Sequence, residues 1–133
     1  MSDINAIISY IVWKGGCLHP FRISRILMLV EWEYEGRYGK RLTDLKYVCE
    51  PFGFYIEGFS ELIKGNPCLR KKKLEKEKAC LEYVCENEPK CKDVIREVID
   101  GILEKVKRLD DVELNRLVIR DERYKRYLVH GKL

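Results

Sequence analysis

The chain contains no glutamine, a single threonine (Thr43) and only four asparagines among its 133 residues. Charged side chains instead make up 36% of the sequence, and lysine, glutamate and arginine dominate them. Replacement of uncharged amides by lysine and glutamate is characteristic of proteins from hyperthermophiles. The composition therefore predicts a hyperthermophilic source.

No apolar run approaches the ~18 residues that a membrane-spanning helix needs. The N-terminal residues MSDINAII carry an acidic residue where a secretory signal peptide would carry positive charge. Both absences predict a cytoplasmic protein with no membrane partner. A chain of this length can bury one hydrophobic core without help from a metal, so we expect one domain over residues 1–133.

The sequence also lacks the motifs of metal sites and of common enzymes. His19 and His130 are its only histidines, and no Cys-x-x-Cys pair occurs. No serine lies in a nucleophile elbow, and no glycine-rich loop could hold a phosphate group. We therefore expect no metal, no cofactor and no catalytic residues.

Six cysteines are present, and intracellular proteins of hyperthermophiles can be rich in disulfides. We expect two local disulfides, Cys68 with Cys80 and Cys85 with Cys91. Each would close a short segment around a charged insert at about residues 66–89.

Apolar residues recur at helical spacing in several segments, and capping residues mark the ends of these segments. The insert at residues 66–89 is too charged for periodicity to decide between a hairpin and a frayed helix. We predict a mainly α fold: a single compact helical domain with at most one small β-hairpin, similar to the wing of a winged helix. The predicted helices run over residues 3–14, from Pro20 to a cap at Gly39, between Gly53 and Gly65, over residues 90–108, after Asp110 or Asp111, and after Asp121; residues 42–49 are predicted to be extended.

Basic residues gather in two places, which makes DNA an alternative partner. A solvated surface is the ordinary explanation for such clusters in a chain with 26 basic and 22 acidic residues. The first cluster is Arg70, Lys71, Lys72 and Lys73, extended by Lys76 and Lys78. The second is Arg116, Arg120, Arg123, Lys125, Arg126 and Lys132, interleaved with Tyr124 and Tyr127.

Residues 37–55, RYGKRLTDLKYVCEPFGFY, follow a long apolar helix and contain aromatic residues, a glycine that can stop a helix, a Thr-Asp pair and a Pro-Phe-Gly break. This stretch resembles the motif K-Y-G-R-P-I-T-G-D-x-Y-V-A-x-P-Y-G-P-V of the Panacea domain, also called SocA-like. Residues 109–124 are similar to the L-S-x-x-E-L…L-x-H-x-D-x-A-Y ending of the same family. The matching positions are Tyr38, Gly39, Thr43, Asp44, Tyr47, Pro51, Gly53, Leu114 and Tyr124.

Three departures from the family pattern are visible, and one of them is that Ile119 or Arg120 stands where the family's C-terminal motif has histidine. Phe54 stands where the family has proline, and the acidic residue of the preceding helix is displaced to Glu31 or Glu33. The chain is therefore similar to a divergent, archaeal member of the family.

The resemblance implies a mainly helical, non-enzymatic domain that acts like an antitoxin, by direct contact with a protein partner. That partner would be toxin-like and encoded by a neighbouring gene; a homodimer without other partners is a further alternative. Aromatic side chains are frequent energetic anchors of such surfaces. The candidates for partner binding are Trp32, Tyr34, Tyr55, Tyr124 and Tyr127. The alternative function is a winged-helix-like DNA-binding protein that uses the basic segment 70–78.

Overall fold

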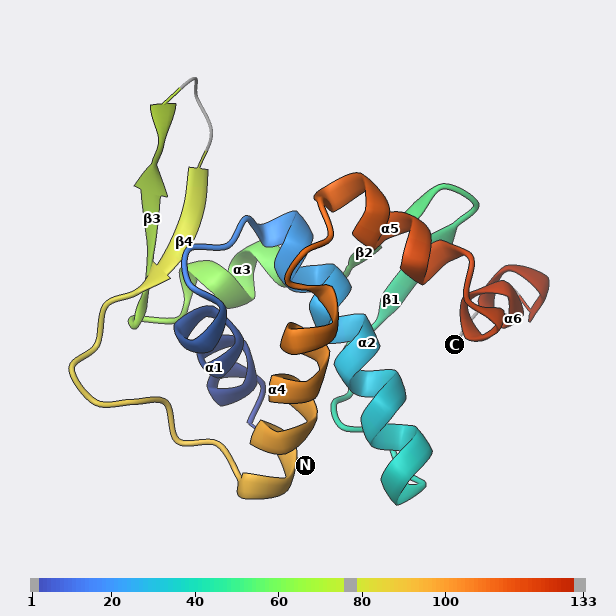
Figure 1. Ribbon diagram of the computed structural model, residues 1–133, viewed down its shortest axis with the longest axis horizontal. Helices are drawn as coiled ribbons and strands as arrows, with labels where there is room; N and C mark the ends of the chain where they lie inside the picture. Colours follow the sequence, from blue (N-terminus) through green and yellow to red (C-terminus); the bar gives the residue numbers. More distant parts are fainter. Residues whose placement is uncertain (1–2, 76–78, 131–133) are drawn as a thin grey trace.

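The computed structural model describes residues 3–75 and 79–130 (Figure 1). This part of the chain forms six helices and two antiparallel two-stranded hairpins, so helix predominates, as the sequence predicts. The helices are α1 (Ile4–Gly15), α2 (Pro20–Tyr38), α3 (Phe59–Lys64), α4 (Asp93–Val106), α5 (Asp111–Ile119) and α6 (Glu122–His130). The strands are β1 (Tyr47–Glu50), β2 (Gly53–Ile56), β3 (Leu69–Lys73) and β4 (Ala79–Tyr83).

Helix α2 begins and ends at the residues that the sequence predicts. It starts at Pro20, whose missing N–H costs nothing in the first turn, and the Nδ1 atom of His19 accepts a hydrogen bond from the backbone N–H of Phe21. It ends at Gly39, which adopts a left-handed conformation with φ 71°. A residue with a Cβ is strained in that conformation, so glycine is the natural stop.

Helix α2 lies at the centre of the fold and packs against α1, α4 and α5 (Figure 1). The buried side chains of α4 lie three or four positions apart and therefore share one face of that helix. Asp110 and Glu113 form a capping box that starts α5. The buried side chains of the core include Ile7, Ile11, Ile23, Leu27, Val30, Ile99, Leu114 and Val118.

The predicted helix between Gly53 and Gly65 is wrong in its first half. Residues 53–56 form strand β2, which pairs with β1 in the register Tyr47↔Ile56 and Cys49↔Phe54. Phe54 and Ile56 are buried, whereas Tyr55 between them is exposed. This period of two is the strand pattern, but four residues are too few to distinguish it from a helix turn. Helix α3 begins only after Gly58, which adopts a left-handed backbone conformation with φ 70°.

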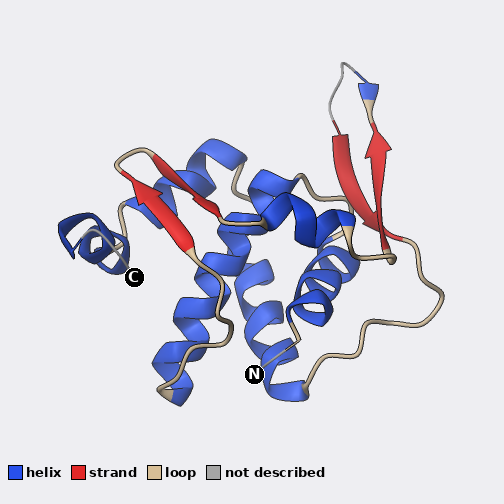
Figure 2. Ribbon diagram, turned by 180° about the vertical axis from the view of Figure 1, so that it is seen from behind, coloured by secondary structure: helices blue, strands red, loops and turns tan. Residues whose placement is uncertain are grey.

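The charged insert forms the second hairpin, β3–β4, in the register Leu69↔Tyr83 and Lys71↔Leu81. Strand β4 contacts α1, and the hairpin projects from the helices at one end of the molecule, whereas the β1–β2 hairpin lies toward the other end (Figure 2). Lys76 and Lys78 of the predicted basic cluster lie outside the described residues. Of the two alternatives for the charged insert, a hairpin and a frayed helix, the structure shows the hairpin.

The predicted disulfide pairing is wrong. Cys17 is bonded to Cys80, with Cα atoms 5.3 Å apart, and Cys68 is bonded to Cys85, with Cα atoms 5.1 Å apart. The strand register explains the second bond, because the backbone N–H of Val84 donates to the carbonyl of Cys68 and so places residue 85 beside residue 68. Cys80 lies opposite Lys72 in the hairpin, four positions along the strand from Cys68.

Cys91, the predicted partner of Cys85, carries a free thiol and packs against the hydrophobic core. None of the described helices is long and apolar enough to cross a lipid bilayer.

Candidate functional site

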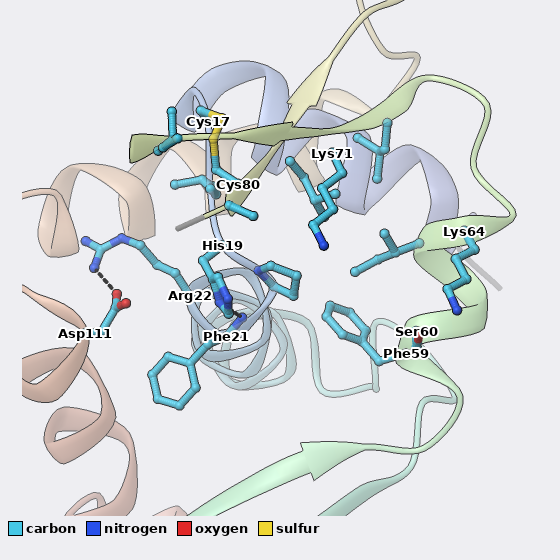
Figure 3. A pocket seen from close by; sticks show the side chains of 17 residues that line it. Cys17, His19, Phe21, Arg22, Phe59, Ser60, Lys64, Lys71, Cys80 and Asp111 are labelled. Carbon is cyan, nitrogen blue, oxygen red and sulfur yellow. Dashed lines mark hydrogen bonds and ion pairs between the residues drawn. A yellow bond between two sulfur atoms is a disulfide. The ribbon is translucent and has the colours of Figure 1, made fainter. Parts of the chain in front are cut away.

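A large open groove lies between the N-terminal end of α2, helix α3 and the β3–β4 hairpin (Figure 3). Its volume is about 1120 Å³. The residues around it come from five separate segments, so no sequence motif marks it. Apolar side chains provide most of its lining: Leu18, Pro20, Phe21, Phe59, Ile63, Leu69, Leu74 and Leu81.

The hairpin wall of the groove is joined to the segment between α1 and α2 by three bonds. The Cys17–Cys80 disulfide is the covalent one. The backbone N–H of Leu18 donates to the carbonyl of Leu81 at 3.0 Å, and the N–H of Leu81 donates back at 2.7 Å. The hairpin is therefore held at the groove by more than its own strand pairing.

The base of the hairpin is fixed to α1. The side-chain amide of Asn66, which is buried, donates to the hydroxyl of Ser9 at 2.8 Å. Its oxygen accepts a hydrogen bond from the backbone N–H of Cys68 at 3.0 Å. The buried side chain of Asn66 thus forms hydrogen bonds through both its nitrogen and its oxygen, and breaking either bond would cost free energy. These bonds hold the start of β3 in a defined position.

The charges at the groove are mainly positive. Arg22 at the start of α2 forms an ion pair with Asp111, with Nη1 3.1 Å from Oδ1, and donates to the carbonyl of Val106 at 2.9 Å. Lys64 and Lys71 also line the groove, and both are exposed. Figure 3 shows Lys71 reaching from the hairpin into the groove opposite Phe59 and Lys64 of α3.

Three of the predicted family-motif residues, Gly39, Thr43 and Tyr47, lie at a second, buried cluster toward the other end of α2. Glu31 is 6% exposed, and its Oε1 atom accepts hydrogen bonds from the backbone N–H of Thr43 at 3.1 Å and from the Thr43 hydroxyl at 2.6 Å. The hydroxyl of Tyr47 donates to its other oxygen. Gly39 lies between α2 and this loop, so the motif ties the loop back onto the helix.

Of the remaining motif residues, Gly53 lies beside Tyr124. The Tyr124 hydroxyl lies 2.7 Å from the carbonyl oxygen of Gly53 and accepts a hydrogen bond from the N–H of Glu50 at 3.2 Å. Leu114 is fully buried in the same core. Tyr38, Asp44 and Pro51 are exposed and bridge no other motif residue.

Phe54, which stands where the family pattern has proline, packs in this region. The guanidinium carbon of Arg25 lies 4.2 Å from the ring centre of Phe54 and 3.8 Å from that of Phe21. Arg25 also donates to the Asn115 side-chain oxygen at 3.1 Å. Burial lowers the pKa of Arg25 to about 10. The guanidinium is thus protonated at neutral pH and serves as a packed layer between two rings.

The structure contradicts three of the five predicted partner-binding residues. Trp32, Tyr34 and Tyr124 are 4%, 7% and 0% exposed, so they cannot contact a partner. Tyr127 is half-buried, and its hydroxyl accepts a hydrogen bond from Trp32 Nε1 at 2.8 Å. Only Tyr55 is well exposed, and it lies on the β1–β2 hairpin rather than at the groove. Aromatic residues of long helical stripes bury themselves in the core.

The predicted nucleic-acid residues are all exposed on β3, but they do not act as one surface. Side chains of a strand alternate between its two faces. Lys71 therefore lines the groove, whereas Arg70 lies on the other face, where its Nη2 atom is 3.0 Å from an oxygen of Glu82.

The free thiols have no arrangement for nucleophilic chemistry. Burial raises the pKa of Cys49 to about 11, and burial also raises the pKa of Cys91. Within residues 3–75 and 79–130, no three His, Cys, Asp or Glu side chains gather in a way that could hold a metal ion.

We expect the Glu31 cluster to produce a pH-dependent stability. Burial raises the pKa of the Glu31 carboxyl, although hydrogen bonds from Thr43 and Tyr47 act in the opposite direction. The folded protein therefore binds this proton more tightly than the unfolded chain, whose glutamate pKa is about 4.3. The Glu31 contribution to stability falls as the pH rises through the window between these two pKa values.

The test is chemical unfolding of the wild type and of the Glu31→Gln variant at several pH values. The difference in unfolding free energy, wild type minus variant, should increase as the pH falls from neutral toward about 4.3, since glutamine does not titrate. A difference that decreases on acidification would contradict the assignment.

No protein-family model, curated protein or solved structure matches this chain. The resemblance to the Panacea domain accordingly stays a prediction, and the groove is the feature on which a function is best argued.

Proposed function

We propose that this chain is a non-enzymatic, Panacea-like protein-binding domain that acts as an antitoxin does, by direct contact with a protein partner. The observation that carries the proposal is the open, apolar groove beside the β3–β4 hairpin. Small-molecule pockets have volumes of ~300–1,000 Å³ and enclose most of their ligand. This groove is somewhat larger and open to solvent on one side, which favours a segment of another protein over a metabolite.

The apolar side chains at the groove give a reason for binding. Leu74 is 47% exposed although it lines the groove, and Phe59 and Ile63 are only partly buried against the core. Apolar surface that is left open in the free protein is covered when a partner docks, and its removal from water stabilises the complex.

The proposal is tested by co-expression with the product of a neighbouring gene and by measuring the mass of the purified assembly. We expect a stable complex, and we expect Leu74→Asp to weaken it by roughly tenfold or more, because a charge replaces a buried apolar contact. Leu128→Asp is the matched control, since Leu128 is 38% exposed on α6, away from the groove.

Two results would count against the proposal. One is equal weakening of the complex by the two leucine substitutions. The other is a chain that forms only a homodimer in solution and binds no neighbouring gene product.

A second candidate function is DNA binding by the β3–β4 hairpin as a wing. The observation that favours it is the exposure of Arg70, Lys71, Lys72 and Lys73 on a hairpin that stands out from the helices. This candidate requires duplex affinity that falls steeply with salt and that is lost when these four residues are replaced by alanine. Absence of duplex binding at low salt would eliminate it.

A further inference from the structure

We propose that the groove binds a segment of the partner in which carboxylate side chains accompany apolar ones. This inference rests on the protein-binding function proposed above and specifies the chemistry of the partner. It follows from the arrangement of charge and apolar surface around the groove.

One acidic side chain, that of Asp111, is among the lining residues of the groove. Asp111 is already paired with Arg22, at 3.1 Å, so the two charges compensate each other. Lys64 and Lys71 line the groove from opposite walls, and neither forms an ion pair with any residue in the described part of the chain. The charge available to a ligand is therefore positive on both walls.

The positions of the two lysines relative to the apolar lining determine what a ligand must offer. Lys64 follows Ile63 on α3, and Lys71 lies opposite Leu81 in the hairpin, two positions along β3 from Leu69. A ligand that covers the leucine and isoleucine side chains brings its own flanking groups to the two ammonium groups. Carboxylates at those points would gain charge-assisted hydrogen bonds, and lysine or arginine there would be repelled.

The same surface is a poor match for nucleic acid. Surfaces that bind nucleic acid are more polar and much more positive than those that bind proteins. Most of the groove lining is apolar, and only one residue of the basic run 70–73 reaches it. Arg70 is engaged by Glu82, whose carboxylate would repel a phosphate backbone on that face of the hairpin.

The experiment uses fluorescent dodecapeptides and the full, oxidised chain. The first peptide contains glutamate with leucine and phenylalanine, the second has lysine in place of every glutamate, and the third has serine in place of every leucine and phenylalanine. We expect the first peptide to bind at least tenfold more tightly than either of the others, by fluorescence anisotropy. Its affinity should fall as salt is added.

The decisive variant is Lys64→Glu together with Lys71→Glu. It should weaken binding of the acidic peptide by roughly tenfold and improve binding of the lysine peptide, because two attractive contacts become repulsive. The control is Lys40→Glu together with Lys46→Glu, which makes the same change in net charge. Both control lysines are exposed and neither lines the groove, so acidic-peptide affinity should change by less than about twofold.

Equal affinity for the acidic and the lysine peptide, or equal losses in the two double variants, would overturn the inference. Tighter binding of a short DNA duplex than of the acidic peptide, lost in the Lys64→Glu and Lys71→Glu variant, would overturn it in favour of nucleic acid. The protein-binding function fails separately, when no stable complex with a protein partner forms. A complex that depends on Leu74 but shows no preference for acidic segments would contradict only the present inference.

Discussion

Removing the Cys17–Cys80 disulfide should lower the free energy of unfolding by about 4 kcal/mol, the largest loss that we expect for any single feature of this chain. The bond joins residues 63 positions apart. A crosslink of this span strongly restricts the unfolded chain, and the restriction grows with the logarithm of the loop length. The Cys68–Cys85 bond spans 17 positions, so its removal should cost about 3 kcal/mol.

The variant for the first bond is Cys17→Ser with Cys80→Ala, because Cys17 is exposed and Cys80 is buried. The control is Cys49→Ala with Cys91→Ala, which removes the two free thiols. Unfolding in guanidinium chloride gives the free energies. Addition of a reductant should destabilise the wild type and the control, but it should affect the disulfide variant less.

Alkylation provides an independent check on the pairing. In denaturant without reductant, the wild type should take up two alkyl groups, one on Cys49 and one on Cys91. After reduction it should take up six. Uptake of six groups before reduction would show that no disulfide exists in the isolated protein, and the predicted loss of 4 kcal/mol would fail with it.

Loss of the same bond should also affect the groove. Cys80 and Leu81 are adjacent on β4, and the Leu18–Leu81 hydrogen bonds are the only other backbone connection between that strand and the segment before α2 among the described residues. Without the disulfide, the hairpin can separate from the groove more easily. A reduced chain that binds its partner as tightly as the oxidised one would show that these backbone bonds suffice.

Glu31→Ala should destabilise the protein by about 3 kcal/mol, the second large effect that we expect. The substitution removes the acceptor of three donors: the Thr43 N–H, the Thr43 hydroxyl and the Tyr47 hydroxyl. A buried donor without a partner costs ~1–3 kcal/mol. Relief of the desolvation that raises the pKa of Glu31 offsets part of this loss.

Two further variants define the size of the Glu31 effect. Glu31→Gln keeps one acceptor oxygen and nearly the same shape, so its cost should be roughly half that of Glu31→Ala. Glu35→Ala is the matched control, because Glu35 is exposed on the same helix and alanine favours helix. Thermal unfolding compares all three. A Glu31→Ala variant as stable as Glu35→Ala would mean that the Thr43 loop does not depend on the carboxylate.

The helices were predictable because their signals are local. Pro20 and Gly39 limit α2, and Asp110 starts α5, through backbone conformations and caps that involve only neighbouring residues. Strand β2 was not predictable, since its four residues satisfy a helical spacing as well as a strand spacing. The alternation of Phe54, Tyr55 and Ile56 acquires meaning only when β1 lies beside it.

The candidate site was less predictable than the fold. The basic run at residues 70–73 marked a segment that belongs to the β3–β4 hairpin beside the groove. It did not indicate that Lys71 is the one residue of this run that lines the groove. The aromatic residues Trp32, Tyr34 and Tyr124 were predicted to bind a partner but are buried. The type of a side chain does not by itself show whether it lies in the core or on the surface. Phe59 and Ile63, which line the groove, looked in the sequence like ordinary core residues.

By itself, the sequence determined the helical character of this protein and the limits of its main helices, because each depends on interactions between residues a few positions apart. For the charged insert it left a hairpin and a frayed helix as alternatives. Only the tertiary structure decided which cysteines bond, which aromatic rings are buried and where a partner could dock. Cys17 is bonded to Cys80, and Phe21 and Leu81 line the same groove, through the packing of segments far apart in the chain. Such long-range juxtapositions depend on the balance of the whole core, and no short stretch of sequence contains them.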